Sequence, residues 1–276
     1  MGLLDTATSF FKPKVLRDGQ QLPNRVVSGT LEWSAEQLQG YAALIGHTDA
    51  QTLPPLWPQV RASGLHLQLF SARDFPLSPI GMVHVSNVSR HFKPMAADAK
   101  LRAEAECVLQ GPAMGGVVFE LVTRVMPMES SDLLAEYRAS ILVRAPRAKS
   151  NEPRGPKKEE PADTRDWRLL KTLDVPSNQG RRYARVSGDY NPIHLAGWLA
   201  RPFGFRRAIA HGVGSMARID AELGRLAGAP TRELGIRFRR PLELPGLTRL
   251  HRQAANPDGF VLLDAQGREL ANGIRR

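Results

Sequence analysis

The pattern of apolar and polar positions divides the chain into two similar stretches, each with helices first and strands later. In the first stretch, Ser34 has the character of a helix N-cap, and apolar residues at helical spacing follow it as far as Ile45. A second, longer helix is expected over residues 60–75. The dipeptide Gly111-Pro112 predicts a turn between two of the β-type runs that follow. These runs lie at residues 81–88, 101–109, 116–126 and 136–143.

The second stretch repeats this order. A strand-like run at 168–175 leads to a candidate cap at Ser177 and a short helix near 182–186. A longer helix is expected from its apolar positions between Val213 and Leu223. Further strands are predicted at 231–239, 248–254, 260–264 and 269–274, the last two joined as a hairpin. One long helix against a curved antiparallel sheet in each half predicts an α+β architecture, and the repetition indicates a duplicated domain.

A boundary separates the two stretches. Residues 145–166 are rich in Pro, Lys, Glu and Asp and nearly devoid of bulky apolar residues. Such a segment cannot offset the entropy lost on ordering, so an exposed linker is expected. We therefore predict a first unit over residues 1–145, a linker over 146–166 and a second unit over 167–276. For 276 residues, two compact units agree with domains of about 150 residues.

Composition excludes several classes of protein. The single cysteine, Cys107, rules out an intrachain disulfide framework and a cysteine-based zinc site. No run of 18 apolar residues is present, so a transmembrane helix and membrane insertion are not expected. The N-terminus lacks the basic, apolar and small-residue pattern of a secretory signal. A cytoplasmic location is therefore expected.

Charge is distributed unevenly along the chain. Residues 167–276 hold 19 basic and 9 acidic residues, a net charge of +10 within a total of +11, and Lys171 is their single lysine. An arginine-rich half is typical of a face that meets phosphate groups, either on a nucleic acid or on a phosphorylated small ligand. General solubility is the alternative explanation.

The densest group of chemically competent residues is YARVSGDYNPIH, which runs from Tyr183 to His194. Gly188 permits a tight turn, and Pro192 disfavours helix at the residue before it. Asp189 is therefore expected on a loop, with His194 near the following helical turn. A carboxylate and an imidazole across such a bend can converge on one water molecule and move a proton near neutral pH. The alternative is a helix-capping aspartate beside a packed histidine.

A second short motif, Ile209-Ala-His-Gly212, precedes the longer helix of the second stretch. A glycine amide at a helix start can donate a hydrogen bond to a developing oxyanion, helped by the helix dipole. An ordinary helix start, with glycine chosen for its backbone, is the alternative for this motif alone.

Taken together, these motifs carry a family resemblance. The pattern Y-x-x-x-S-G-D-x-N-P-x-H at 183–194, Gly204-Phe205, I-A-H-G at 209–212 and the segment 236–246 resemble the hydratase 2 motif of the MaoC-like dehydratase family. Residues 80–86 and 91–94 of the first unit resemble the family more weakly. The resemblance implies a double hot-dog fold, with two curved antiparallel sheets each packed on a central helix.

The resemblance also implies an activity, the (R)-specific hydration of trans-2-enoyl thioesters or the dehydration of (3R)-3-hydroxyacyl thioesters in fatty acid metabolism. Asp189 and His194 would activate the water that adds to C3, and Gly212 would polarise the thioester carbonyl. No metal and no redox cofactor is implied, and coenzyme A or acyl carrier protein would carry the substrate. The implied substrate-binding residues are Tyr183, Ser187, Asn191, His211, Arg206, Arg207, Arg237 and Arg239.

The first unit departs from this pattern. The segment from Tyr41 to His47 parallels Tyr183 to Asp189, but a histidine stands at the position of the aspartate, and no Asn-Pro-x-x-His follows. We therefore expect one active site per chain and a catalytically degenerate first unit. His84 and His91 in that unit are interpreted as packing or hydrogen-bonding residues.

The arginines of the second unit acquire a role from the resemblance. Arg206 and Arg207 precede His211, and Arg237 and Arg239 share a strand face by the two-residue period. They could meet the phosphates of coenzyme A or the acidic surface of a carrier protein. Three alternatives stay open: an acyl-thioester-binding subunit without catalysis, a hot-dog thioesterase and, without any recognised motif, a nucleic-acid-binding module. The sequence does not fix the oligomeric state, and a homo-oligomer is one option.

Overall fold

The computed structural model describes residues 12–13, 16–17, 19–79, 81–113, 115–144 and 163–276. Most of the predicted linker, residues 146–162, lies outside these ranges. Within the described residues, no helix combines the length and the apolar character needed to cross a membrane.

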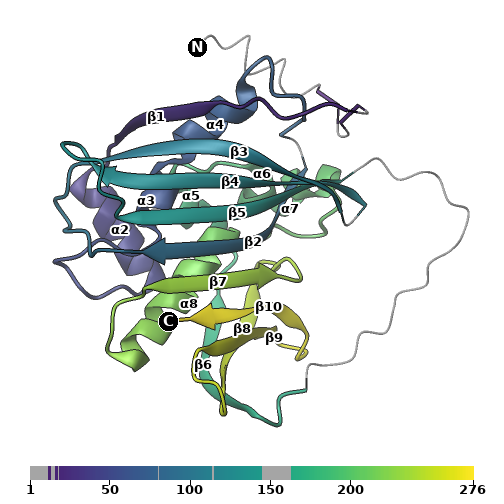
Figure 1. The fold of residues 1–276 in the computed structure, drawn as a ribbon. Coiled ribbons are helices and arrows are strands. Elements are labelled where there is room, and N and C mark those ends of the chain that lie inside the picture. The colour runs from purple at the N-terminus through teal and green to yellow at the C-terminus, as the bar shows by residue number, and fades with distance from the viewer. Residues whose placement is uncertain (1–11, 14–15, 18, 80, 114, 145–162) are drawn as a thin grey trace, which may run out of the picture.

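All strands named here join one antiparallel sheet in the order β1-β3-β4-β5-β2-β7-β10-β9-β8-β6 (Figure 1). Each half of the sheet repeats one topology, because β1 to β5 and β6 to β10 both follow the order first, third, fourth, fifth, second. The strands are β1 (Val26–Leu31), β2 (Met82–His91), β3 (Leu101–Ala113), β4 (Gly116–Pro127), β5 (Ala135–Arg144), β6 (Trp167–Val175), β7 (Glu233–Phe238), β8 (Gly246–Gln253), β9 (Gly259–Asp264) and β10 (Glu269–Arg275).

The two halves meet edge to edge through β2 and β7. Their antiparallel register runs from Ser86 opposite Arg237 to Arg90 opposite Glu233. The sheets expected for the two units are therefore continuous with each other.

The helices lie together on one face of the sheet (Figure 1). They are α2 (Ala35–Ile45), α3 (Trp57–Arg61), α4 (Ser63–Ser71), α5 (Gln179–Ser187), α6 (Pro192–Leu195), α7 (Gly197–Ala200), the 3-10 turn η1 (Arg201–Phe203) and α8 (Gly212–Ala227). The largest hydrophobic cluster joins both halves, since it contains Tyr41 and Trp57 of the first together with Tyr183, Met216 and Phe260 of the second. The shared core fixes the helices of one half against those of the other.

The expected α+β architecture is confirmed, with differences in the first half. Ser34 caps α2 as predicted, in a reciprocal capping box with Gln37. The single helix expected over 60–75 is instead two helices, α3 and α4, which meet at Ala62. Strand β1 was not predicted. The turn expected at Gly111-Pro112 is wrong, because β3 runs through both residues with a bulge before Gly111.

The second half follows its prediction more closely. All five predicted strands are present, and the hairpin between β9 and β10 turns at Gly267, which has a φ of 77°. The predicted cap at Ser177 is wrong by one residue, since Asn178 occupies the N-cap of α5. The parallel between the halves extends to detail: Gly46 and Gly188 end α2 and α5 in left-handed conformations with φ of 81° and 80°.

Candidate active site

Asp189 is placed by the end of α5. Gly188 adopts a left-handed conformation there, and its N–H bonds to the carbonyl oxygen of Ala184, so the chain turns sharply into the next residue. The hydroxyl oxygen of Ser187 accepts a hydrogen bond from the Asp189 amide at 3.1 Å. Oδ1 of Asp189 in turn accepts from the Asn191 amide at 3.1 Å. The carboxylate is thus held by its own loop while 46% of its side chain stays exposed.

His194 lies on the short helix α6, which begins at Pro192. The side chain of Asn191 caps this helix by accepting from the Ile193 amide at 3.4 Å. Nδ1 of His194 donates to the carbonyl oxygen of Ile209 at 2.8 Å, and the Ile209 amide donates to the carbonyl of Ile193 at 3.0 Å. Since a carbonyl can only accept, Nδ1 carries the proton and Nε2 presents a free lone pair.

His211 stacks on His194 and completes the group. The two ring centroids are 3.7 Å apart with an interplanar angle of 29°, and the ring of Tyr183 lies 4.4 Å from that of His211. Nε2 of His211 lies 3.1 Å from the backbone oxygen of Asp189 and 3.7 Å from its carboxylate Oδ2. One nitrogen or oxygen atom from each of Asp189, His194 and His211 lies within 4.8 Å of the others. The carboxylate of Asp189 and the imidazole of His194 therefore lie near each other, and their joint action on one water molecule stays a prediction.

Burial sets the protonation states of the two imidazoles. Desolvation lowers the pKa of His194, and the Ile209 carbonyl and the Asp189 charge offset this only in part. The pKa of His211 is lowered by burial and then by its neighbour His194. Both rings are therefore neutral near pH 7, and His194 can accept a proton at Nε2.

Gly212 begins α8 directly after His211. The N-cap residue of α8 is His211, and its side chain makes no hydrogen bond to the first turn of this 16-residue helix. The amides of the first turn therefore keep their N–H groups free, and the positive end of the helix dipole lies at the site. A β-carbon at Gly212 would lie 3.3 Å from the ring of Phe238 and 3.6 Å from Nδ1 of His84. The absence of a side chain keeps this narrow space open beside the amide.

Two predicted arginines line a neighbouring open cleft. Arg206 and Arg207 border a cavity of about 370 Å³ together with Arg181, whose guanidinium donates to the carbonyl oxygen of Leu195 at 2.9 Å. The cleft adjoins the loop that carries His194, since Leu195 and the two residues after it form part of its wall. A basic surface therefore lies next to the candidate pair.

The other predicted residues are distributed differently. Tyr183 and Ser187 are buried, and they contact His211 and the Asp189 backbone, respectively. Arg237 lies on the sheet face opposite to Phe238, because successive strand residues point to opposite faces and Phe238 contacts Gly212. Arg239 pairs with Glu269 at 3.4 Å beyond the end of β7. The structure does not bring Arg237 and Arg239 to the pair.

The cluster of Asp189, His194 and His211 also contains the residue types that bind transition metals. Zn²⁺ would require each ring nitrogen to approach it in the plane of its own ring at about 2.0–2.1 Å. The two rings are instead stacked face to face at 3.7 Å. Because the two ring planes are only 29° from parallel, one ion cannot lie in the plane of both rings at that distance, so the arrangement does not fit a metal ion.

Sequence reasoning missed the residues that hold the site from a distance. A β-carbon at Gly180 of α5 would overlap the carbonyl oxygen of His194, so only glycine fits there. The Ile209 backbone forms a bridge to Glu243, and the Ala210 amide donates to the Leu242 carbonyl at 2.8 Å. The I-A-H-G motif contained Ile209, but Ile209 acts through its backbone carbonyl and amide, and such a role cannot be seen in the pattern of side chains.

Known proteins resemble this chain in sequence. Residues 153–242 match the MaoC like domain family. A 3-hydroxyacyl-thioester dehydratase X of Mycobacterium tuberculosis is 28% identical over 240 residues, which cover 87% of this chain and 83% of that protein. The chain carries a MaoC-like dehydratase domain. It is homologous to that mycobacterial dehydratase.

Solved structures show that the chain has a double hot-dog fold. The crystal structure of HtdX from Mycobacterium tuberculosis superposes with a TM-score of 0.75 at 24% identity, covering 91% of this chain and 99% of that one. A second Mycobacterium tuberculosis protein, described as a double hotdog fold, gives a TM-score of 0.60 at 11% identity, covering 94% and 98%. The fold expected from the sequence is therefore confirmed.

Proposed function

We propose that the protein is a hydro-lyase that interconverts trans-2-enoyl thioesters and (3R)-3-hydroxyacyl thioesters in fatty acid metabolism. The observation that carries this proposal is that a carboxylate oxygen of the exposed Asp189 and a ring nitrogen of His194 lie within 4.8 Å of each other, while the Ile209 carbonyl engages Nδ1 of His194 and leaves its Nε2 free. The dehydratase name of the mycobacterial homologue supports the same reaction.

The chemistry follows from the protonation states. In hydration, Asp189 and His194 hold one water molecule, and Nε2 of His194 takes a proton as the oxygen attacks C3. Negative charge then develops on the thioester oxygen, where the Gly212 N–H and the dipole of α8 stabilise it. The proton on His194 passes to C2 as the enolate collapses, which restores the neutral ring. Dehydration is the same sequence reversed.

The other residues around the pair position it. Asn191 and Ser187 shape the loop of Asp189 through hydrogen bonds to its backbone and carboxylate. Tyr183 and His211 form a stack under His194, which fixes the plane of its ring. These residues act through Asp189 and His194 in this proposal.

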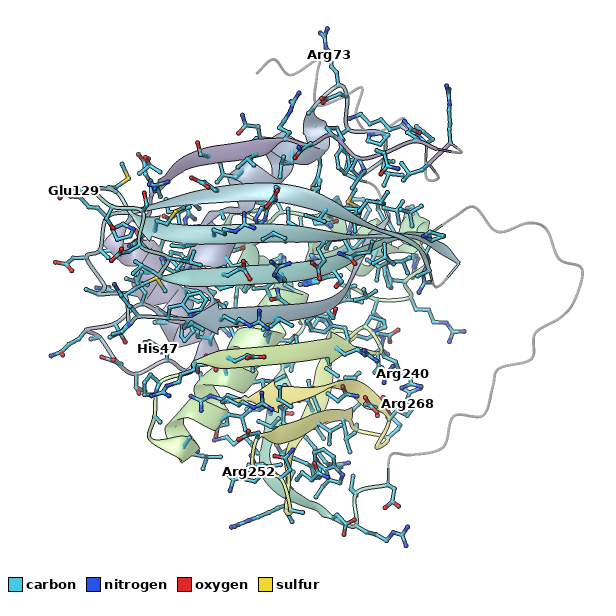
Figure 2. The ribbon with its side chains drawn as sticks, viewed as in Figure 1. His47, Arg73, Glu129, Arg240, Arg252 and Arg268 are labelled. Carbon is cyan, nitrogen blue, oxygen red and sulfur yellow. The ribbon has the colours of Figure 1, made fainter. Side chains whose placement is uncertain are left out.

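The thioester carrier is assigned to the basic cleft. Arg181, Arg206 and Arg207 present guanidinium groups that suit the phosphates of coenzyme A or of the phosphopantetheine arm of acyl carrier protein. Outside the cleft, many arginines of this half are engaged within the chain. Arg268, for example, pairs with Asp264 at 2.7 Å, and Figure 2 shows Arg252 well apart from Arg240 and Arg268. This dispersal favours a small phosphorylated ligand over a nucleic acid.

The proposed reaction uses side chains and backbone amides of the chain itself, and we propose that it needs no resident cofactor. The first unit carries His47 at the position of Asp189, and its Nε2 lies 3.2 Å from the Thr52 carbonyl. We therefore propose a single active site per chain. A cytoplasmic location and a homo-oligomer stay predictions.

The decisive experiment is a turnover assay with trans-2-enoyl thioesters of increasing length, beginning with crotonyl-CoA and run in parallel on enoyl acyl carrier protein. Loss of the enoyl absorption and formation of the (3R)-hydroxy product are expected. Release of free thiol without hydration would identify a thioesterase. Calorimetric binding without either reaction would identify a binding subunit. Either of these two results would refute the proposal.

The same assay tests the carrier cleft. Replacing Arg206 and Arg207 together by Ala is expected to raise KM and to leave kcat nearly unchanged, because the carrier contacts are equal in the ground and transition states. Substitution of Arg252, a half-buried arginine that does not line the cleft, by Ala is the matched control. An unchanged KM in the double variant would show that the cleft does not bind the thioester carrier.

A further inference from the structure

His84 belongs to the first unit, yet it lies against the start of α8 in the second. Its Nδ1 is 3.6 Å from the position that a β-carbon of Gly212 would take. Its ring also lies beside Phe238 of β7, with ring centroids 5.1 Å apart. A polar side chain of the first unit therefore lies beside the residue whose amide the proposed reaction uses.

A β-bulge accounts for this reach. The register of β2 against β5 shifts between His84 and Ser86, so Val85 is the extra residue. Pairing of β2 with β7 begins only at Ser86. His84 thus lies just past the junction of the two half-sheets, and bulges commonly re-aim side chains at such sites.

The neighbours of His84 indicate where its proton lies. Nδ2 of Asn87, a fully buried residue, lies 3.4 Å from Nε2 of His84. An amide nitrogen donates, so Nε2 accepts and Nδ1 carries the proton of the neutral ring. Burial lowers the pKa of His84 to about 4, although the Ser86 carbonyl opposes the change. Nδ1, which lies 3.6 Å from the β-carbon position of Gly212, therefore carries the N–H of the neutral ring.

We propose that His84 is a catalytic residue contributed by the first unit, and that its Nδ1–H donates to the thioester carbonyl oxygen beside the Gly212 N–H. This role rests on the proposed hydro-lyase function. A neutral imidazole can polarise a carbonyl without carrying charge, and paired donors at a developing oxyanion act most strongly where water is excluded. The degenerate unit then supplies half of the oxyanion site.

Two substitutions of His84 separate this role from packing. In His84→Asn the amide nitrogen takes the place of Nδ1, whereas in His84→Gln it takes the place of Nε2. We expect His84→Gln and His84→Leu to lower kcat for crotonyl-CoA hydration by about 100-fold with little change in KM. His84→Asn should restore most of kcat. His91→Asn is the matched control on the same strand and should retain wild-type kcat, because His91 lies against Tyr137 instead.

A binding signature supplies a second readout. Polarisation of the carbonyl should shift the absorption band of bound crotonyl-CoA to longer wavelength. The spectrum is measured in an Asp189→Asn background, whose slow turnover leaves time to record it. We expect the shift to be lost with His84→Gln and kept with His84→Asn. Equal band shifts in both, or a Gln variant more active than the Asn variant, would overturn the proposal.

The two proposals fail in different ways. Absence of wild-type turnover would refute the hydro-lyase function. The band shift on binding would still show whether His84 contacts the carbonyl. Wild-type turnover with full kcat in all three His84 variants would refute only the role of His84.

Discussion

The carbonyl oxygen of Ile209 accepts a hydrogen bond from Nδ1 of His194 at 2.8 Å, although 15 positions separate the two residues in the chain. This bond fixes the proton on the nitrogen that faces the protein. The other nitrogen, Nε2, is left as the base. One backbone carbonyl thereby connects the two motifs, D-x-N-P-x-H and I-A-H-G, into one site.

The pH dependence of kcat/KM should report the protonation of His194. Its neutral form is the active base for hydration, so activity falls as pH decreases through its pKa. Burial lowers this pKa below the ordinary value of about 6.5. We expect the acidic limb of kcat/KM to have its midpoint below pH 6.5, measured with crotonyl-CoA while circular dichroism confirms the fold at each pH. A midpoint above pH 6.5 would contradict the burial argument.

Substitution of Gly180 should lower activity as strongly as substitution of a catalytic residue, although Gly180 does not contact substrate in the proposed reaction. A β-carbon there would overlap the carbonyl oxygen of His194, so Gly180→Ala must displace α6 or α5. Since catalysis requires accurate placement of the base, kcat should fall by about 100-fold.

The control for Gly180 is another helical glycine. Gly64 in α4 has open space around its missing β-carbon. Gly64→Ala should keep full activity and raise stability by less than about 1 kcal/mol, because the gain of about 0.5–1 kcal/mol applies to helix interiors and Gly64 lies in the first turn of α4. Equal activity of the two variants in the turnover assay would show that the close contact at Gly180 is unimportant.

Asp220 should matter for stability rather than chemistry. Its carboxylate accepts hydrogen bonds from Thr231 at 2.6 Å and from Arg275 at 3.2 Å, with both charged side chains more than 90% buried. Asp220→Asn leaves the Arg275 charge buried without its partner, so we expect a loss of about 3–5 kcal/mol in the free energy of unfolding, measured by urea denaturation.

An exposed pair on the same helix provides the comparison. Arg225 pairs with Glu222 at 2.7 Å, but 56% of its side chain is exposed. Arg225→Gln should therefore cost less than about 1 kcal/mol. Similar losses in the free energy of unfolding for the two variants would mean that the buried pair stabilises the protein no more than the exposed pair does.

The sequence predicted those parts of the molecule that depend on local pattern. The N-cap at Ser34, the turn at Gly188 and the glycine at the start of α8 depend on residues close in the chain, and all are present. The long helix expected over 60–75 divides at Ala62, directly before Ser63-Gly64, a dipeptide typical of turns that the helical pattern outweighed in the prediction. Gly111-Pro112 indicated a turn, but a bulge in β3 accommodates both.

Long-range relationships could not be predicted in this way. The edge-to-edge pairing of β2 with β7 joins segments almost 150 residues apart, and it places His84 near Gly212. Arg237 and Arg239 were expected to meet phosphates, but the strand phase of β7 directs Arg237 to the face away from Gly212. Which face of a strand meets a helix is decided by tertiary packing rather than by the strand's own two-residue period.

The central claim is that Asp189 and His194 act together on one water molecule, and a double-mutant analysis of hydration tests it most directly. Measured by kcat with crotonyl-CoA, Asp189→Asn and His194→Ala should each lose about 10²- to 10⁴-fold, and the double variant should lose little more than either. Wild-type kcat in either single variant, with the fold intact, would contradict the account.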